Sequence, residues 1–306
     1  MKVALVSYSS IKEKSIKWLW HPYIAYGKVT ILEGDPGEGK TSIVLYLIAL
    51  LSSGNKQISN LERKPINVIF QSAEDNPEDS IKPKLNKQKG NCDNVYFIKG
   101  NESLTVDCLE IEESIVSLKA KLVVFDPFQA FLGDSNLINV SGLRAVLGKL
   151  VKIAEKYKCA ILLIGHVNKT GVAKDIYRSL GSIDIVAIAR SVLMIKKPNE
   201  HSSIRIMYQI KNNLSSLGEP VGFNFGNNGT INYLGPVNPE DYELDTSKLN
   251  VARLFIENCL LNGELSYKEI ISFAHSEGIS IRTLNRAKKE MKIKTKKKKD
   301  GWYWSL

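Results

Sequence analysis

Eight consecutive residues constrain this chain more than any other feature. Residues 34–41 match the pattern GxxxxGK[ST], directly after a short apolar segment at 29–32 and directly before an apolar stretch at 43–51. A strand, a glycine-rich turn and a helix N-terminus in this order aim several backbone N–H groups at one anion. The terminal lysine and threonine of the pattern add a cation for phosphate oxygens and a hydroxyl for Mg²⁺. The sequence therefore predicts a binding site for ATP and Mg²⁺ made of Gly34, Asp35, Pro36, Gly37, Glu38, Gly39, Lys40, Thr41 and Ser42.

The pattern around this motif predicts an α/β fold. From residue 28 to about residue 233, short β-branched runs alternate with longer segments of helical periodicity, which is typical of a parallel sheet with crossover helices. Continuous apolar runs such as residues 122–125 indicate strands buried on both faces. We expect strands at 29–32, 67–71, 95–98, 122–125, 160–164, 192–195, 204–210 and 221–225, and helices at 40–53, 111–119 and 143–157.

Length and composition limit the class of protein. With 306 residues, 43% hydrophobic and 24% charged, the chain is long enough for two globular domains. Its longest apolar run has nine residues, well below the roughly 20 that span a bilayer. Four scattered cysteines have no CxxC spacing, which argues against a zinc or redox pair. We expect a cytoplasmic protein with no membrane partner.

The positive charge is concentrated at one end. Residues 281–306 carry a net charge of +8, which leaves only +2 of the total +10 for the first 280 residues. A Gly-, Asn- and Pro-rich stretch at 226–245 predicts a closing hairpin and a linker. Beyond it, helices at 249–261, 267–277 and 281–291 and a basic hairpin from residue 292 are expected. Residues 1–245 are therefore predicted to form the nucleotide-binding domain and residues 246–306 a winged helix-turn-helix.

Two carboxylates are candidates for chemistry beside the nucleotide. Asp126 ends an apolar strand, where ligands of open α/β sheets gather, and is predicted to hold Mg²⁺ together with Thr41. The residue after Asp126 is Pro127 and not a glutamate, so the base that activates the attacking water must come from another segment. Glu74, just past the second strand, is the candidate base, although its neighbours Asp75 and Glu78 offer the same chemistry.

The last predicted helix has the features of a helix that binds a nucleic-acid groove. Ser280 is a predicted N-cap, and Ile281, Leu284 and Met291 are expected to point inward. On the opposite face, cations recur at a spacing of three to four residues, and the following hairpin adds lysines for phosphate contacts. The predicted contacts to duplex DNA are Arg282, Arg286, Lys289, Lys296 and Lys297, with RNA left open.

The ordered motifs of residues 18–225 resemble the RecA-like ATPases of plasmid and phage replication, close to hexameric replicative helicases. The motifs are residues 34–41, Ser72-Ala73-Glu74-Asp75, Phe125-Asp126-Pro127, residues 164–169, Gly181-Ser182 with Ala189-Arg190, and residues 210–213. The resemblance implies a ring of identical subunits. It also implies single-stranded DNA bound by a core loop, and a replication initiator or primase as partner.

The same resemblance implies roles for further residues. His166 stands where the family has a polar residue that senses the γ phosphate, and Lys84 where it often has an arginine near the adenine. Arg190 and Lys211 match cations that reach the γ phosphate of the neighbouring subunit. The polar loop at 168–179 corresponds to the loop that faces DNA, and its cations are Lys169, Lys174 and Arg178.

Two functions fit these patterns. One is an ATP-hydrolysing motor of mobile-element replication, helicase-like and hexameric. The other is an ATP-dependent loader or regulator that switches its assembly state on DNA without unwinding it. Both need the nucleotide site and the nucleic-acid contacts. A small-molecule kinase would need an acceptor-binding lid, and the predicted C-terminal domain is a poor substitute for one.

Overall fold

The computed structural model describes most of the chain. The described residues are 5–62, 64–99, 104–106, 108–133, 140–165, 188–198, 202–242, 248–260, 263–276, 279–298 and 301–305. They form two compact units, Met1–Asp241 and Tyr242–Leu306. Among these residues, every helix is too short or too polar to cross a membrane.

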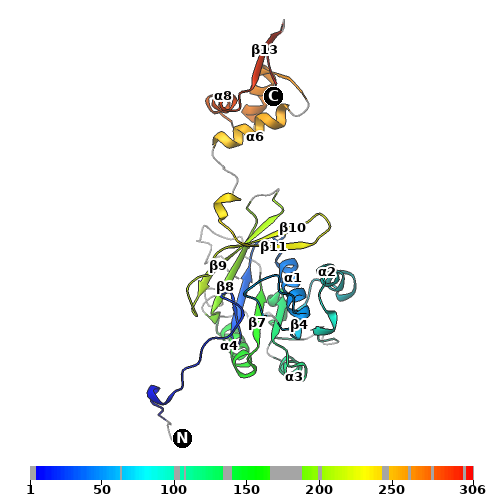
Figure 1. Cartoon of the computed structure of the whole chain (residues 1–306), viewed down its shortest axis with the longest axis vertical. Helices are drawn as coiled ribbons and strands as arrows, with labels where there is room; N and C mark the ends of the chain where they lie inside the picture. The colour runs from blue at the N-terminus through cyan, green and yellow to red at the C-terminus, as the bar shows by residue number, and fades with distance from the viewer. Residues whose placement is uncertain are drawn as a thin grey trace. The chain divides into compact units, whose positions relative to one another are not determined.

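The larger unit is built on a nine-stranded mixed sheet with helices on both faces (Figure 1). Its strand order is β11-β10-β9-β8-β3-β7-β6-β4-β5. The strands are β3 (Val29–Glu33), β4 (Val68–Ser72), β5 (Val95–Tyr96), β6 (Leu122–Asp126), β7 (Ala160–Ile164), β8 (Ser191–Lys196), β9 (Ile204–Asn212), β10 (Val221–Phe225) and β11 (Ile231–Pro236).

The helices of this unit include α1 (Lys40–Ser53), α2 (Lys82–Lys87), α3 (Leu109–Leu118) and α4 (Val140–Tyr157). Shorter turns are η1 (Tyr8–Ser10), a π-helical turn η2 (Pro77–Ile81), η3 (Cys92–Asn94), η4 (Phe128–Phe131) and η7 (Pro239–Asp241). A small separate ribbon pairs β1 (Trp18–Trp20) with β2 (Ile24–Ala25).

Alternation along the central strands creates two hydrophobic cores, one on each face of the sheet. In β6, Leu122 and Val124 belong to the core that α1 and α2 cover, while Val123 and Phe125 belong to the core that α3 and α4 cover. The continuous apolar runs in the sequence follow from this burial on both faces. The predicted α/β class is confirmed by this arrangement.

One half of the sheet differs from the expected parallel arrangement. Strands β3 to β8 pair in parallel, whereas β8, β9, β10 and β11 are joined by antiparallel pairing. The connections between the last four strands contain few residues, whereas parallel neighbours need a crossover of a dozen or more residues. These strands therefore pair in the antiparallel direction. In addition, the predicted strand at 95–98 is reduced to Val95–Tyr96, an edge strand.

The described residues of the smaller unit form three helices and a three-stranded antiparallel sheet. Its elements are α6 (Lys248–Leu260), β12 (Leu265–Ser266), α7 (Tyr267–Ser276), α8 (Ile281–Glu290), β13 (Lys294–Lys298) and β14 (Gly301–Ser305), with sheet order β12-β14-β13. Trp304 is buried with Ile256, Ile270 and Leu284 in a core of its own. One prediction is wrong: Ile281 is 52% exposed, because it begins α8 and only Leu284 and Ala287 of that helix are fully buried.

Candidate nucleotide-binding site

The glycine-rich turn joins β3 to α1 and needs its glycines for steric reasons. Gly39 is the N-cap of α1 with φ of 82°, in the left-handed region that glycine adopts without strain. A Cβ on Gly39 would lie 2.7 Å from Cζ of Phe225, and one on Gly34 would lie 2.6 Å from the carbonyl oxygen of Ile195. The turn therefore keeps its backbone in close contact with β8 and β10, and α1 starts at Lys40 as the sequence predicts.

Lys40 is 5% exposed and is held inside this turn. Its ammonium donates to the carbonyl oxygens of Gly34 and Asp35 at 2.8 and 3.0 Å. Burial lowers the pKa of Lys40, while the charges of Asp126, Asp35, Glu38 and Glu74 act in the opposite direction. A cation in a buried turn surrounded by carboxylates and backbone N–H groups has the chemistry to bind phosphate oxygens.

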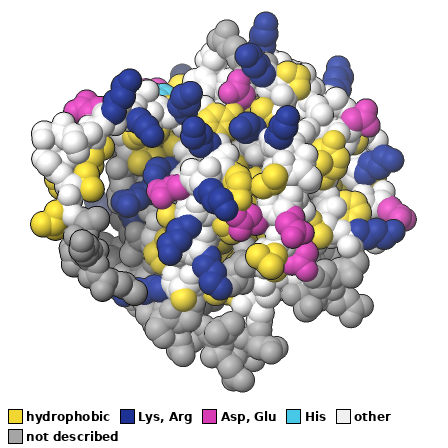
Figure 2. All heavy atoms as spheres, turned by 90° about the horizontal axis from the view of Figure 1, so that it is seen from below, with side chains coloured by type: hydrophobic (Ala, Val, Ile, Leu, Met, Phe, Trp, Pro, Cys, Tyr) yellow, Lys and Arg dark blue, Asp and Glu magenta, His cyan; other side chains and the backbone are white. Residues whose placement is uncertain are grey.

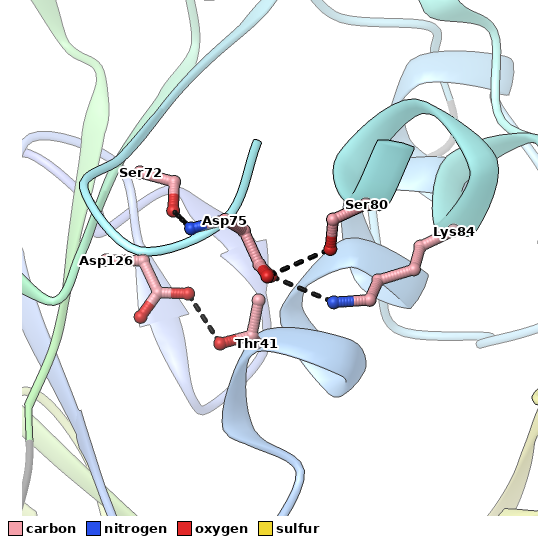
Figure 3. A network of polar contacts seen from close by, with 6 residues as sticks. All are labelled: Thr41, Ser72, Asp75, Ser80, Lys84 and Asp126. Carbon is pink, nitrogen blue, oxygen red and sulfur yellow. Dashed lines mark hydrogen bonds and ion pairs between the residues drawn. The ribbon is translucent and has the colours of Figure 1, made fainter. Parts of the chain in front are cut away.

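Thr41 and Asp126 meet at the carboxyl ends of the central strands (Figure 3). The Thr41 hydroxyl donates to Oδ2 of Asp126 at 2.6 Å. Asp126 is 5% exposed, and burial raises the pKa of its carboxyl, against the opposing effect of the Thr41 hydrogen bond. A hydroxyl and a carboxylate are the hard oxygen donors that Mg²⁺ prefers when phosphates and waters supply the other ligands. These residues fit Mg²⁺ bound to a nucleotide.

The three acidic candidates after β4 separate in the structure. Glu74 is exposed and lines the same cavity as Lys40 and Asp126, and its charge acts on both of them. Asp75 accepts hydrogen bonds from Ser80 at 2.9 Å and from Lys84 at 2.9 Å (Figure 3). Although partial burial acts the other way, these contacts lower the pKa of Asp75. Glu78 lines a different cavity.

Lys84 also lies at this cavity, paired with Asp75. The cavity has a volume of about 340 Å³, and its lining comes from the glycine-rich turn, the start of α1, the loop after β4, α2 and the end of β6. The lining residues are Gly37, Gly39, Lys40, Thr41, Ser42, Ser72, Glu74, Asp75, Lys84 and Asp126. Within the described residues, no group of three or more His, Cys, Asp or Glu side chains forms a metal cluster.

Arg190 and Lys211 lie together but away from this cavity. The Arg190 amide donates to the carbonyl of Val29, the first residue of β3, at 3.2 Å. Lys211 is opposite Val192 in the β8–β9 ladder. Burial and, after it, the charge of Arg190 lower the pKa of Lys211. Both cations therefore lie at the amino edge of the central strands, whereas the nucleotide cavity lies at the carboxyl edge.

Arg205 is a site residue that the sequence analysis missed. Its Nε donates to the carbonyl of Glu38 at 3.2 Å, and its guanidinium lies over the Phe225 ring at 4.9 Å. It thereby supports the glycine-rich turn from β9, which follows the turn by more than 160 residues in the sequence. No local motif marks such a residue, and only the antiparallel return of β9 brings it to the turn.

The nucleic-acid candidates of the smaller unit are exposed cations. Arg282, Arg286 and Lys289 are exposed on α8, and Arg286 donates to Glu290 at 3.2 Å. Lys296 and Lys297 are exposed on β13, and Lys297 lies over the ring of Trp302 at 6.0 Å. The side chain of Ser280 caps α8 by accepting from the amide of Thr283 at 3.2 Å. Four further candidates lie outside the described residues: His166, Lys169, Lys174 and Arg178.

These features define a P-loop nucleotide site on a RecA-like sheet. Residues 6–172, more than half of the chain, match the family model described as AAA domain, and the chain belongs to this family.

Curated relatives include DNA repair protein RadA of Streptococcus pyogenes serotype M3, 24% identical over 214 residues, which are 69% of this chain and 42% of the relative. RadA of Listeria monocytogenes serovar 1/2a is 25% identical over 213 residues, with the same coverages. The chain thus spans less than half the length of these relatives.

Two solved structures share the fold. A DnaB-like replicative helicase, described with its interactions with primase, superposes with a TM-score of 0.53 at 12% identity, over 68% of this chain and 57% of that one. An isolated ATPase domain gives the same TM-score at 13% identity, over 68% of this chain and 85% of that one.

Proposed function

We propose that this chain is a DNA-binding ATPase that acts as a helicase-like ring in the replication of a mobile element. The observation that carries the proposal is the 2.6 Å contact between Thr41 and Asp126 in the cavity that also contains Lys40 and Glu74. A phosphate-binding lysine, two oxygen donors for a metal and an exposed carboxylate are the parts that phosphoryl transfer to water requires.

Each of these residues has a distinct task. Lys40 exchanges its two carbonyl partners for phosphate oxygens of ATP, and Thr41 with Asp126 holds the metal in position. Bound Mg²⁺ supplies charge neutralisation at the phosphates. Glu74 orients a water molecule toward the γ phosphate and accepts its proton, because it is an exposed carboxylate that lines the same cavity as Lys40 and Asp126. His166 is proposed to sense the γ phosphate.

Arg190 and Lys211 act on a neighbouring subunit in this proposal. Their place at the amino edge keeps them from their own nucleotide, and a trans cation stabilises the charge of a transferring phosphoryl group. Hydrolysis then depends on assembly into a ring or filament.

The DNA contacts are divided between the two units. Single-stranded DNA is proposed to bind the core loop with Lys169, Lys174 and Arg178. The smaller unit, proposed to be a winged helix, binds duplex DNA through the cations of α8 and β13, since exposed lysines and arginines on a short helix and hairpin fit a phosphate backbone. A replication initiator or primase is the proposed protein partner.

Strand displacement tests the proposal. The purified chain is mixed with Mg²⁺, ATP and a forked duplex, and both phosphate release and strand separation are measured. We expect DNA-stimulated hydrolysis together with unwinding. Hydrolysis without strand separation would instead support a loader or regulator, and absence of ATP binding by calorimetry would contradict both functions.

A further inference from the structure

A second hollow lies at the amino edge of the sheet and is surrounded by lysines. It has a volume of about 440 Å³ and is separate from the nucleotide cavity. Figure 2, the view from below, shows Lys and Arg side chains gathered on this side of the larger unit. Five exposed lysines line the hollow and are called the edge lysines: Lys17, Lys64, Lys119, Lys121 and Lys158.

Backbone hydrogen bonds connect Lys121, one of the edge lysines, to the neighbouring strands. The Lys121 amide donates to the carbonyl of Asn67 at 2.9 Å, and the Lys121 carbonyl accepts from the amide of Ala160 at 2.9 Å. The Asn67 side chain donates to the carbonyl of Leu118 at 2.6 Å. These bonds join the starts of β4, β6 and β7, so the hollow is built on the ends of buried strands.

The charge of the hollow is not balanced. Among the described residues that line it, the one carboxylate is Glu62, which accepts from the Tyr26 hydroxyl at 3.1 Å and the Lys64 amide at 3.2 Å. Within the described part of the chain, none of the edge lysines forms a salt bridge. By contrast Lys28, in the same region of the fold, is paired with Glu155 at 2.8 Å.

Two of the edge lysines occupy backbone positions that favour glycine. Lys119 and Lys158 both have φ of 51°, in the left-handed region where a side chain is strained. Lys119 caps the end of α3, and Lys158 follows α4. The helix dipole favours a cation at such an end, and Lys89, with φ of 59°, likewise follows the end of α2. The helix dipole does not explain why five lysines line one hollow.

We propose that this hollow binds phosphodiester groups of single-stranded nucleic acid. Five lysine side chains that line one concave surface fit several phosphates without reading bases, which is how strands are bound without sequence preference. A flexible strand enters a hollow, whereas a rigid duplex presents a convex backbone. The inference rests on the proposed function and adds to it a strand contact at the edge opposite to the nucleotide.

The test uses the full chain and compares lysine-to-glycine variants at positions where the backbone is left-handed. Lys119→Gly with Lys158→Gly removes two charges of the hollow and relieves left-handed strain. Lys89→Gly is the matched control, because Lys89 is exposed and left-handed but does not line the hollow. Binding of a fluorescent single-stranded oligonucleotide is measured over a series of salt concentrations, with ATPase activity measured in parallel.

Each phosphate neutralised on a single strand contributes about −0.7 to the slope of log affinity against log salt. We expect the slope of the double variant to be less steep than that of the wild type by about 1.4, and Lys89→Gly to keep the wild-type slope. Lys121→Gln, expected to make the slope about 0.7 less steep, provides the same measurement if the double variant does not fold.

If the wild type and the variants of the edge lysines have equal slopes while ATPase activity is intact, the hollow does not bind the strand. This result would leave the proposed function untouched. A changed slope for duplex but not for single strands would overturn the single-strand assignment. A wild type that neither hydrolyses ATP nor binds DNA would overturn the proposed function itself.

Discussion

The backbone amide of Arg190 donates to the carbonyl of Val29, so Arg190 lies at the start of β3 while the glycine-rich turn follows the end of that strand. Four residue steps of about 3.3 Å place the two ends roughly 13 Å apart. In the proposed function, Arg190 acts on the nucleotide of a neighbouring subunit and not on that of its own chain.

A mixing experiment tests this arrangement. If Arg190 acts as an arginine finger, Arg190→Ala lowers ATP turnover by about 10³–10⁵-fold. Lys40→Ala also abolishes turnover, because the phosphate-binding cation is removed. A mixture of the two variants should regain activity where a Lys40→Ala subunit supplies Arg190 to a neighbour with an intact cavity. Each variant alone is the control, and no recovery at any mixing ratio would contradict action between subunits.

Glu74→Gln should reduce turnover by about 10²–10⁴-fold while ATP binding is kept, because the amide retains the shape but does not accept the proton. Single-turnover hydrolysis and calorimetric ATP binding give the two readouts. Glu78→Gln is a suitable control, since Glu78 is an exposed carboxylate in the same segment that lines another cavity. Normal turnover in Glu74→Gln would show that Glu74 is not the base.

Local sequence signals predicted much of this structure for identifiable reasons. The expected bounds of α1 match, because Gly39 caps its start and Gly54, left-handed with φ of 70°, caps its end. The apolar run at β6 predicted burial on both faces. By contrast, the antiparallel half of the sheet and the contact of Arg205 with Glu38 depend on long-range pairing. Periodicity contains no information on strand direction, so these features were not predictable from it.

In the candidate site, too, some residues could be predicted from local sequence and others could not. Lys40, Thr41 and Ser42 come from one motif, and the structure brings Asp126 and Glu74 to the same cavity. Glu74, Asp75 and Glu78 were not separable by residue type. The structure distinguishes them, because Asp75 contacts Ser80 and Lys84 while Glu74 and Glu78 line different cavities. The burial of Glu33 was not predictable, because a carboxylate at the end of a strand gives no sign in the sequence that it is fully buried.

Two glycines of the motif should respond differently to alanine. Gly34→Ala places a Cβ 2.6 Å from the Ile195 carbonyl oxygen, so backbone must move, and we expect a loss of about 1–3 kcal/mol in the free energy of unfolding together with weaker ATP binding. Gly37→Ala meets nothing within 4 Å and costs only the strain of its φ of 82°, about 1–2 kcal/mol. Denaturant unfolding and calorimetry measure both. Full ATP affinity in Gly34→Ala would show that the turn does not need this close contact.

Glu33 should make stability depend on pH. Burial raises the pKa of Glu33 to about 7, against the opposing charge of Lys40. A carboxyl that binds its proton more tightly when folded stabilises the fold below its unfolded pKa, and this contribution is lost as pH rises through the folded value. The loss is about 3 kcal/mol between roughly pH 4.5 and pH 8.

Glu33→Gln removes this titration, so Tm of the variant minus Tm of the wild type should be larger at pH 8 than at pH 5. Glu113→Gln, a change at an exposed carboxylate of α3, should shift Tm equally little at both values. A difference that is the same at both pH values would show that Glu33 does not titrate in this range.

The exposed cations of α8 should set the salt dependence of duplex binding. Combined Arg282→Gln, Arg286→Gln and Lys289→Gln removes three charges from one exposed face, and each duplex phosphate that is no longer neutralised makes the log–log slope about 0.9 less steep. We expect a change of up to about 2.7, with the smallest share from Arg286, because Glu290 already pairs with it. Lys268→Gln, which removes an exposed charge from α7, is the control and should leave the slope unchanged. An unchanged slope in the triple variant would mean that duplex DNA binds elsewhere, and the same titration with Lys296→Gln and Lys297→Gln would then test whether β13 provides the contact.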